Sequence, residues 1–165
     1  MKDQQTKDKL ASVLSRVLEQ VAFVFSEPAG ELAKIDPAAE PYIEISLKYS
    51  GASTGHLSLI LPLSLSRQFS SGMLGIEPDP NDEADSQADA AKEIGNIVTG
   101  QLLTELFGTK AIFNVAAPEV HELLPEQFFA LLEGREYVCN MVENQPVIAM
   151  LTQTEVEHER QGSYR

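Results

Sequence analysis

The stretch Asp89–Phe107, DAAKEIGNIVTGQLLTELF, constrains the fold of this 165-residue chain more than any other part of the sequence. Its apolar residues recur at helical spacing, which predicts one amphipathic helix. Ala91, Ile94, Val98 and Leu102 fall on the same side of that helix. They supply an apolar face that the fold must bury.

The polar side of the same helix carries a narrow stripe of four residues. At about 100° per residue, Asp89, Glu93, Asn96 and Gly100 fall within roughly 60° of one another, along about three turns. Gly95, Gly100 and Asn96 are poor helix formers and together cost about 2.5 kcal/mol of helix propensity. Because stability alone would not select such a helix, we interpret the stripe as a candidate functional site.

Composition limits the class of protein. The chain is long enough, at 43% hydrophobic residues, for one domain with a substantial core, which we expect to be ordered over about residues 7–153. A net charge of −13 argues against nucleic acid and anionic membranes as partners. The sequence shows no membrane span, no signal segment and a single cysteine, Cys139, which favours a cytoplasmic protein.

The order of the expected elements predicts the fold class. We expect helices at Lys7–Phe25, Leu63–Leu74, Asp89–Phe107 and within His121–Gly134, and strands at Tyr42–Tyr49, His56–Leu61, Lys110–Ala116, Arg135–Val142 and Val147–Gln153. This order indicates an α+β fold, with an antiparallel or mixed sheet and helices packed on one face. Residues 1–6 and 155–165 are expected to be frayed or mobile. Residues 75–85 form an acidic loop, and the Asp, Glu and Ser residues just before the following helix are expected to cap it.

Other catalytic arrangements find little support in the sequence. His56, His121 and His158 share no ligand spacing, so we expect no metal site of the protein's own. Ser53 and Ser71 lack a matched His and Asp context for a nucleophile. A glycine-rich loop that could hold a phosphate is also missing from the sequence.

The pattern Asp89-xxx-Glu93-xx-Asn96-xxx-Gly100 resembles the signature of the CheC/CheX/FliY chemotaxis phosphatases. The order of elements around it is also similar to that family: a first helix, a hairpin, one motif helix and then strands. The resemblance extends over roughly residues 10–152, and only one intact motif is present. It therefore implies a single CheX-like domain over residues 1–165, of the single-site branch.

The resemblance implies a function in two-component signalling. The substrate would be the aspartyl phosphate of a CheY-type response-regulator receiver domain. Asn96 would orient the attacking water, and Glu93 would pair with a lysine of the receiver. Asp89 and Gly100 would contact the partner. The protein would need no cofactor, because the receiver carries the Mg²⁺.

Two further expectations follow from the same resemblance. The chain could be a binding module that docks a receiver or a switch protein without hydrolysis, or a purely structural subunit.

Relatives of this type also tend to dimerise by joining their sheets. We expect a homodimer, because Val147–Gln153 offers an apolar strand that would be a liability at an open edge.

Overall fold

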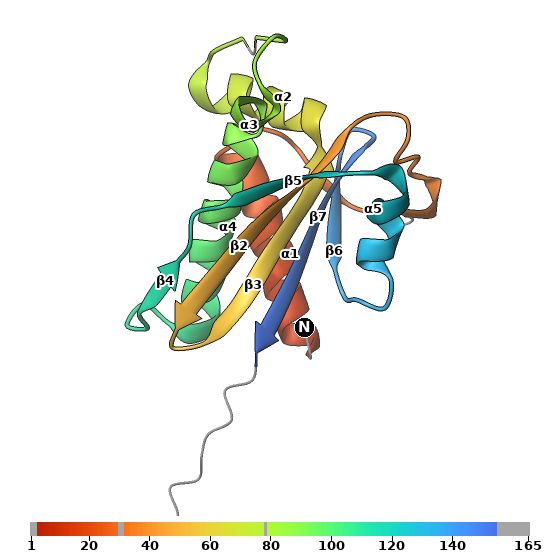
Figure 1. Ribbon diagram of the computed structural model, residues 1–165. Helices are drawn as coiled ribbons and strands as arrows, with labels where there is room; N and C mark the ends of the chain where they lie inside the picture. Colours follow the sequence, from red (N-terminus) through yellow and green to blue (C-terminus); the bar gives the residue numbers. More distant parts are fainter. Residues whose placement is uncertain (1–2, 30–31, 78, 155–165) are drawn as a thin grey trace, which may run out of the picture.

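The computed structural model describes residues 3–29, 32–77 and 79–154. Within these residues the chain forms a twisted sheet whose long strands lie in front of two long helices, α1 and α4 (Figure 1). The elements follow in the order α1 (Gln4–Gln20), β1 (Glu27–Pro28), a short 3-10 helix (Leu32–Lys34), β2 (Tyr42–Gly51), β3 (Thr54–Pro62), α2 (Leu63–Leu74), α3 (Ala84–Gln87), α4 (Asp89–Phe107), β4 (Phe113–Val115), β5 (Glu119–Leu123), α5 (Pro125–Leu132), β6 (Val138–Val142) and β7 (Gln145–Thr154).

The seven strands form one sheet in the order β1-β6-β7-β3-β2-β4, and β5 also pairs with β2. Every pairing is antiparallel. The central hairpin joins β2 to β3, with Tyr49 opposite Gly55 and Tyr42 opposite Pro62. The predicted α+β fold with an antiparallel sheet is therefore confirmed.

The main core lies between the sheet and helices α1 and α4. Alternate residues of β2, namely Ile43, Ile45 and Leu47, are buried in this core, because side chains of a strand point alternately to its two faces. Leu14 of α1 and Ile94 of α4 belong to the same cluster. The motif helix thus buries its apolar side against the sheet and the first helix.

Helix α5 packs on the opposite face of the sheet from α1 and α4. The prediction that the helices pack on one face was therefore wrong for α5. Phe128 lies in a second buried cluster with Ile60 of β3 and Ile148 of β7. Its ring also contacts the ring of Tyr42, with centroids 4.8 Å apart in an edge-to-face arrangement. Because the outer face carries these apolar residues at one end, a short helix there has a surface to bury against.

The first helix differs from its prediction at both ends. It begins at Gln4, because the Asp3 carboxylate accepts the Thr6 backbone N–H at 2.6 Å and caps it. Residues 3–6 are therefore ordered rather than frayed, and the helix ends at Gln20 instead of continuing to Phe25. The tail 155–165, which was predicted to be mobile and includes His158, lies outside the described residues.

Several strands also differ from their predictions. Strand β4 is shorter than the predicted 110–116, β6 begins at Val138 instead of Arg135, and β1 and β5 were not predicted at all. The residues of β5 are exposed or only half-buried, so they lack the alternation that marks a strand in a sequence. The backbone of β2 orders this segment, since β5 pairs with it from Tyr42 to Ser46.

Strand β7 is not the open edge on which the expected dimer was argued. It pairs with β3 through Ile148 and with β6 through Ala149, so its apolar first half lies inside the sheet. The homodimer stays a prediction from the family resemblance. No helix in the described part of the chain is long and apolar enough to cross a membrane.

Candidate functional site

Helix α4 runs from Asp89 to Phe107, the bounds predicted from the sequence, and buries its apolar side. Ile94, Val98 and Leu102 are all buried. Gly95 is buried as well, and a Cβ atom at this position would lie 2.9 Å from Leu47 Cδ1. The glycine therefore lets the helix approach β2 closely, which gives this poor helix former a role in packing.

The four residues of the stripe lie on the open side of the same helix. Asp89 and Glu93 are exposed and Asn96 is half-buried. Gly100 is exposed, and a Cβ atom built there would meet no atom within 4 Å. The stripe extends along roughly 16 Å of helix and is accessible to a partner along its length.

The start of α4 is capped by a residue that the sequence did not suggest. Ala88 occupies the N-cap position without a side-chain hydrogen bond, so the local capping predicted from the residues just before the helix was wrong there. Instead, the Oγ of the buried Ser66 in α2 accepts the backbone N–H of Ala91 at 3.3 Å. The same hydroxyl donates to the carbonyl oxygen of Gln87 at 2.7 Å.

Gln87 connects α2, the acidic loop and the start of α4. Its side-chain oxygen accepts hydrogen bonds from Nε of Arg67, at 3.1 Å, and from Nη2 of the same guanidinium. Its side-chain amide donates to the carbonyl oxygen of Asp82. One residue therefore fixes the segment that leads into the motif helix.

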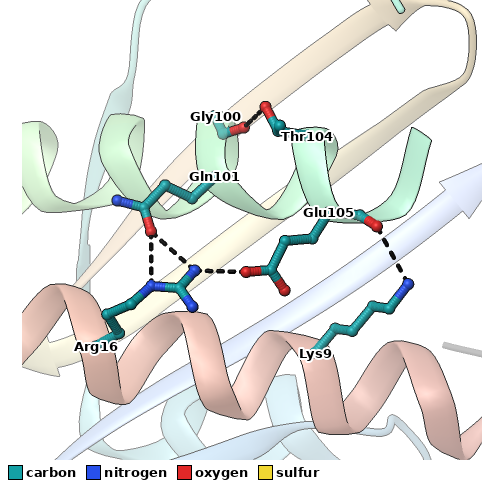
Figure 2. A network of polar contacts seen from close by, with 6 residues as sticks. All are labelled: Lys9, Arg16, Gly100, Gln101, Thr104 and Glu105. Atoms are coloured by element: carbon teal, nitrogen blue, oxygen red, sulfur yellow. Dashed lines mark hydrogen bonds and ion pairs between the residues drawn. The ribbon is translucent and has the colours of Figure 1, made fainter. Parts of the chain in front are cut away.

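A second network joins α4 to α1 near the other end of the helix, as Figure 2 shows. The Arg16 guanidinium donates to Oε1 of Gln101 at 3.0 and 3.2 Å and pairs with the Glu105 carboxylate at 2.5 Å. Lys9 Nζ donates to the Glu105 carbonyl oxygen at 3.1 Å. Because α4 is held in this way at both ends, it presents the stripe from a rigid support.

A groove lies directly beside the stripe, between the end of α2, the acidic loop and the first turns of α4. It encloses a volume of about 730 Å³. Its lining residues are Val21, Arg67, Ser70, Met73, Leu74, Ile76, Glu77, Asp79, Asp82, Ser86, Gln87, Asp89, Ala90, Glu93 and Ile97. Asp89 and Glu93 thus belong both to the stripe and to the wall of this groove. The sequence showed the acidic loop but not that it folds back beside α4.

The stripe has a cation beside it on α4 itself, but the part of the chain that the structure describes offers it no cluster of metal ligands. Lys92 Nζ lies 3.2 Å from Oδ1 of Asp89, which gives this carboxylate a cation partner on the helix itself. Among residues 3–29, 32–77 and 79–154, no three His, Cys, Asp or Glu side chains are grouped so that they could hold a metal ion. Cys139 lies on β6, where burial raises the pKa of its thiol to about 12.

The stripe combines a carboxylate and an amide about one turn apart, because Glu93 and Asn96 differ by about 4.5 Å along the helix axis. An amide can donate to and accept from a water molecule without titrating, and a carboxylate binds an ammonium group. Together these groups can position a water molecule and a cationic group next to one another. The fold and site therefore define an α+β protein that carries a carboxylate–amide pair on the open side of a fixed helix.

Comparison with known families identifies the class more closely. The family model described as chemotaxis phosphatase CheX matches residues 44–126, half of the chain, and this region includes all of α4. The chain belongs to this family, which confirms the predicted CheC/CheX/FliY relationship. Among curated protein sequences, none matches the chain.

Solved structures with the same fold come from the same group of proteins. The chemotaxis protein CheX of Desulfovibrio desulfuricans is 16% identical, covers 91% of this chain and 99% of its own, and superposes with a TM-score of 0.64. A CheC-like protein of Shewanella sp. PV-4 is 20% identical, with coverage of 91% and 99% and a TM-score of 0.62. A CheX–CheY–BeF3–Mg²⁺ complex of Borrelia burgdorferi is 17% identical, with coverage of 90% and 97% and a TM-score of 0.60. At these identities the likeness shows a shared fold.

Proposed function

We propose that this protein is a phosphatase that hydrolyses the aspartyl phosphate of a CheY-type receiver domain. One observation carries the proposal: Asp89, Glu93, Asn96 and Gly100 form an accessible stripe on a helix that is anchored at both ends. Membership of the CheX family supports it. The alternative proposals share this fold but assign the stripe no chemistry.

The partner in this proposal is a phosphorylated receiver domain. The Borrelia burgdorferi relative forms a complex with CheY in the presence of BeF3 and Mg²⁺, where BeF3 stands in for the phosphoryl group. For our chain, the acidic surface and the accessible stripe are compatible with a partner that offers a lysine beside its phosphate. The Mg²⁺ would belong to the receiver, so the phosphatase would contribute no cofactor.

Asn96 is the proposed catalytic residue. A water molecule attacks phosphorus, the bond from phosphorus to the aspartyl oxygen breaks, and the products are inorganic phosphate and the free carboxylate of the receiver. The Asn96 amide holds this water in line with the breaking bond. Acyl phosphates are reactive, so correct positioning of the water supplies a large part of the rate enhancement.

Glu93 contacts the receiver's lysine, one turn away from the water. Its carboxylate is exposed and lies on the same stripe, so an ammonium group beside the phosphate could reach it while Asn96 holds the water. Asp89 forms the edge of the contact, next to Lys92. Gly100 has no side chain, which allows the surface of the partner to approach the helix closely.

The test is a survey of receiver domains from the same cell. Each receiver is phosphorylated, and the decay of its phosphoryl group is followed with and without the protein. We expect accelerated decay for at least one receiver. Glu93→Gln should raise the KM for that receiver about tenfold, which corresponds to about 1.4 kcal/mol. Glu133→Gln, an exposed carboxylate just after α5, is the matched control and should leave KM unchanged.

The survey also separates hydrolysis from simple binding. If a receiver binds only when phosphorylated, but its phosphoryl lifetime never shortens, the protein is a binding module and the phosphatase proposal fails. If Glu93→Gln and Asn96→Ala change neither binding nor decay for any receiver, the stripe has no role in recognition. That outcome would favour a structural subunit.

A further inference from the structure

We call the groove beside the stripe the α2–α4 groove. Part of its lining is apolar, and we call these apolar residues the floor. Met73, Val21 and Ile97 line it. Leu74 and Ile76 also line it and stay 66% and 61% exposed. Large apolar side chains that remain open to water next to a candidate site are typical of an interaction surface.

The charged residues of the lining, which we call the rim, are mostly acidic. The carboxylates of Glu77, Asp79, Asp82, Asp89 and Glu93 line the groove, and the basic residue in the lining is Arg67. The Arg67 guanidinium is hydrogen bonded to the Gln87 side chain. The rim therefore attracts a partner segment that carries Lys or Arg, and it repels acidic segments.

The groove is already shaped in the free protein. The side chain of Gln87 joins α2 to the acidic loop, as described above. Within the loop, Oδ1 of Asp79 accepts the Asn81 backbone N–H at 2.8 Å. The Asp82 backbone N–H donates to the Asp79 carbonyl oxygen at 3.1 Å. A groove with fixed walls binds a segment at a lower entropic cost than one that must first be ordered.

We propose that the α2–α4 groove binds a second segment of the same receiver domain that places its phosphate against the stripe. This segment inserts one or two apolar side chains into the floor, and its flanking Lys or Arg residues contact the rim. The inference rests on the proposed function. It adds a surface, about one helical turn away from the reacting atoms, on which receivers are distinguished from one another.

Continuity and charge both favour the receiver as the occupant. Asp89 and Glu93 are shared between the groove and the stripe, so a domain bound at the stripe must also cover part of the groove. A second copy of this chain fits the rim poorly, because it carries a net charge of −13 and would place acidic surface against acidic surface.

A charge-reversal pair tests the inference on the full-length protein. Glu77→Lys combined with Asp82→Lys changes two exposed residues of the rim. Glu122→Lys combined with Glu133→Lys changes the net charge equally at exposed positions outside the groove and is the matched control. Ile76→Ser removes an apolar contact from the floor without altering the charge. The probes are the receiver domains of the same cell, activated with beryllofluoride, and the phosphorylated receiver that responds in the survey.

We expect the rim variant to raise both the Kd for the activated receiver and the KM at least tenfold, while kcat stays within twofold of wild type. The dependence of Kd on salt should weaken in the same variant. Ile76→Ser should raise Kd several-fold at any salt concentration, and the control pair should behave as wild type. An unchanged kcat would show that the rim residues act in docking the receiver and not in positioning the water.

Three results would overturn the inference. Equal affinities for the rim variant and the control pair would show that the groove is not part of the contact. Self-association in light scattering that the rim variant abolishes would make a second copy the occupant. If no activated receiver binds the wild-type protein, both proposals fail together. If receivers bind without turnover, only the phosphatase proposal fails, and the same affinities still decide the role of the groove.

Discussion

At the scale of single residues, the two glycines of α4 show how one residue type serves opposite needs. A Cβ atom at Gly95 would come within 2.9 Å of Leu47 Cδ1, whereas one at Gly100 would meet no atom within 4 Å. Both glycines weaken the helix by about 1 kcal/mol relative to alanine. The first cost is offset by close packing, and the second has no such compensation in the free protein.

This contrast predicts a conflict between stability and function at Gly100. Gly100→Ala should raise the free energy of unfolding by about 1 kcal/mol, because the methyl group meets nothing and improves helix propensity. The same variant should bind the receiver more weakly, because its methyl group lies in the contact. Urea unfolding and receiver titration measure the two effects.

Gly95→Val is the matched control in the same helix. It should lower the free energy of unfolding by about 2 kcal/mol, because the added methyl groups have no space beside Leu47. A stabilised Gly100→Ala that binds the receiver as well as wild type would remove Gly100 from the partner surface.

At the scale of elements, the N-terminus of α4 depends on a residue of another helix. Ser66 is fully buried, and its hydroxyl bonds both to the Gln87 carbonyl oxygen and to the Ala91 backbone N–H. Ser66→Ala leaves both backbone groups without this partner, so it should lower the free energy of unfolding by about 1–3 kcal/mol. Ser71→Ala, an exposed position on the same helix, is the control and should change stability by less than about 0.5 kcal/mol. Equal urea midpoints for Ser66→Ala and Ser71→Ala would contradict the role of Ser66 as a cap of α4.

The limits of prediction from sequence follow from the same elements. Helix α4 could be predicted to the residue, because Ala91, Ile94, Val98 and Leu102 recur at helical spacing and Gly108 follows its last residue. Strand β2 was predicted in the same way, because the apolar residues Ile43, Ile45 and Leu47 alternate with polar ones. In contrast, Ser66 caps a helix 25 residues further along the chain, and no local pattern reveals such a bond.

The candidate site divides in the same way. The stripe is a property of one helix, so the spacing of its residues was enough to place Asp89, Glu93, Asn96 and Gly100 on one face. The α2–α4 groove could not be found in this way, because it needs α2, the acidic loop and α4 to lie side by side. Strand β5 escaped prediction for a related reason, since pairing with β2 and not its own apolar pattern defines it.

At the scale of the whole molecule, burial of three weak acids, Cys139, Tyr42 and Tyr49, sets a limit to stability at high pH. Burial raises the pKa of Cys139 from 9.0 to about 12 and that of Tyr42 from 10.0 to about 12, and it raises the pKa of Tyr49 above its ordinary value. Above pH 9 the unfolded chain releases these protons while the folded protein retains them, so ionisation favours the unfolded state. Below pH 8 these groups should therefore not change the free energy of unfolding with pH. Between pH 9 and 12 their ionisation should lower it.

Urea unfolding at pH 7.5, 9 and 10.5 checks this prediction. Cys139→Ala should reduce the loss of stability between pH 9 and 10.5, because one of the three weak acids is absent. A midpoint that does not move between pH 7.5 and 10.5 would show that the thiol and the two phenols ionise equally in the folded and unfolded states.

The central claim concerns Asn96, and it is tested most directly by single-turnover decay of the phosphorylated receiver at saturating protein. The wild-type protein should shorten the phosphoryl lifetime. Asn96→Ala should reduce this acceleration about 100-fold or more while the Kd for the beryllofluoride-activated receiver stays close to the wild-type value, because the amide acts on the water and not on docking. Asn96→Ala protein that binds the receiver and still shortens the lifetime as wild type does would contradict the account.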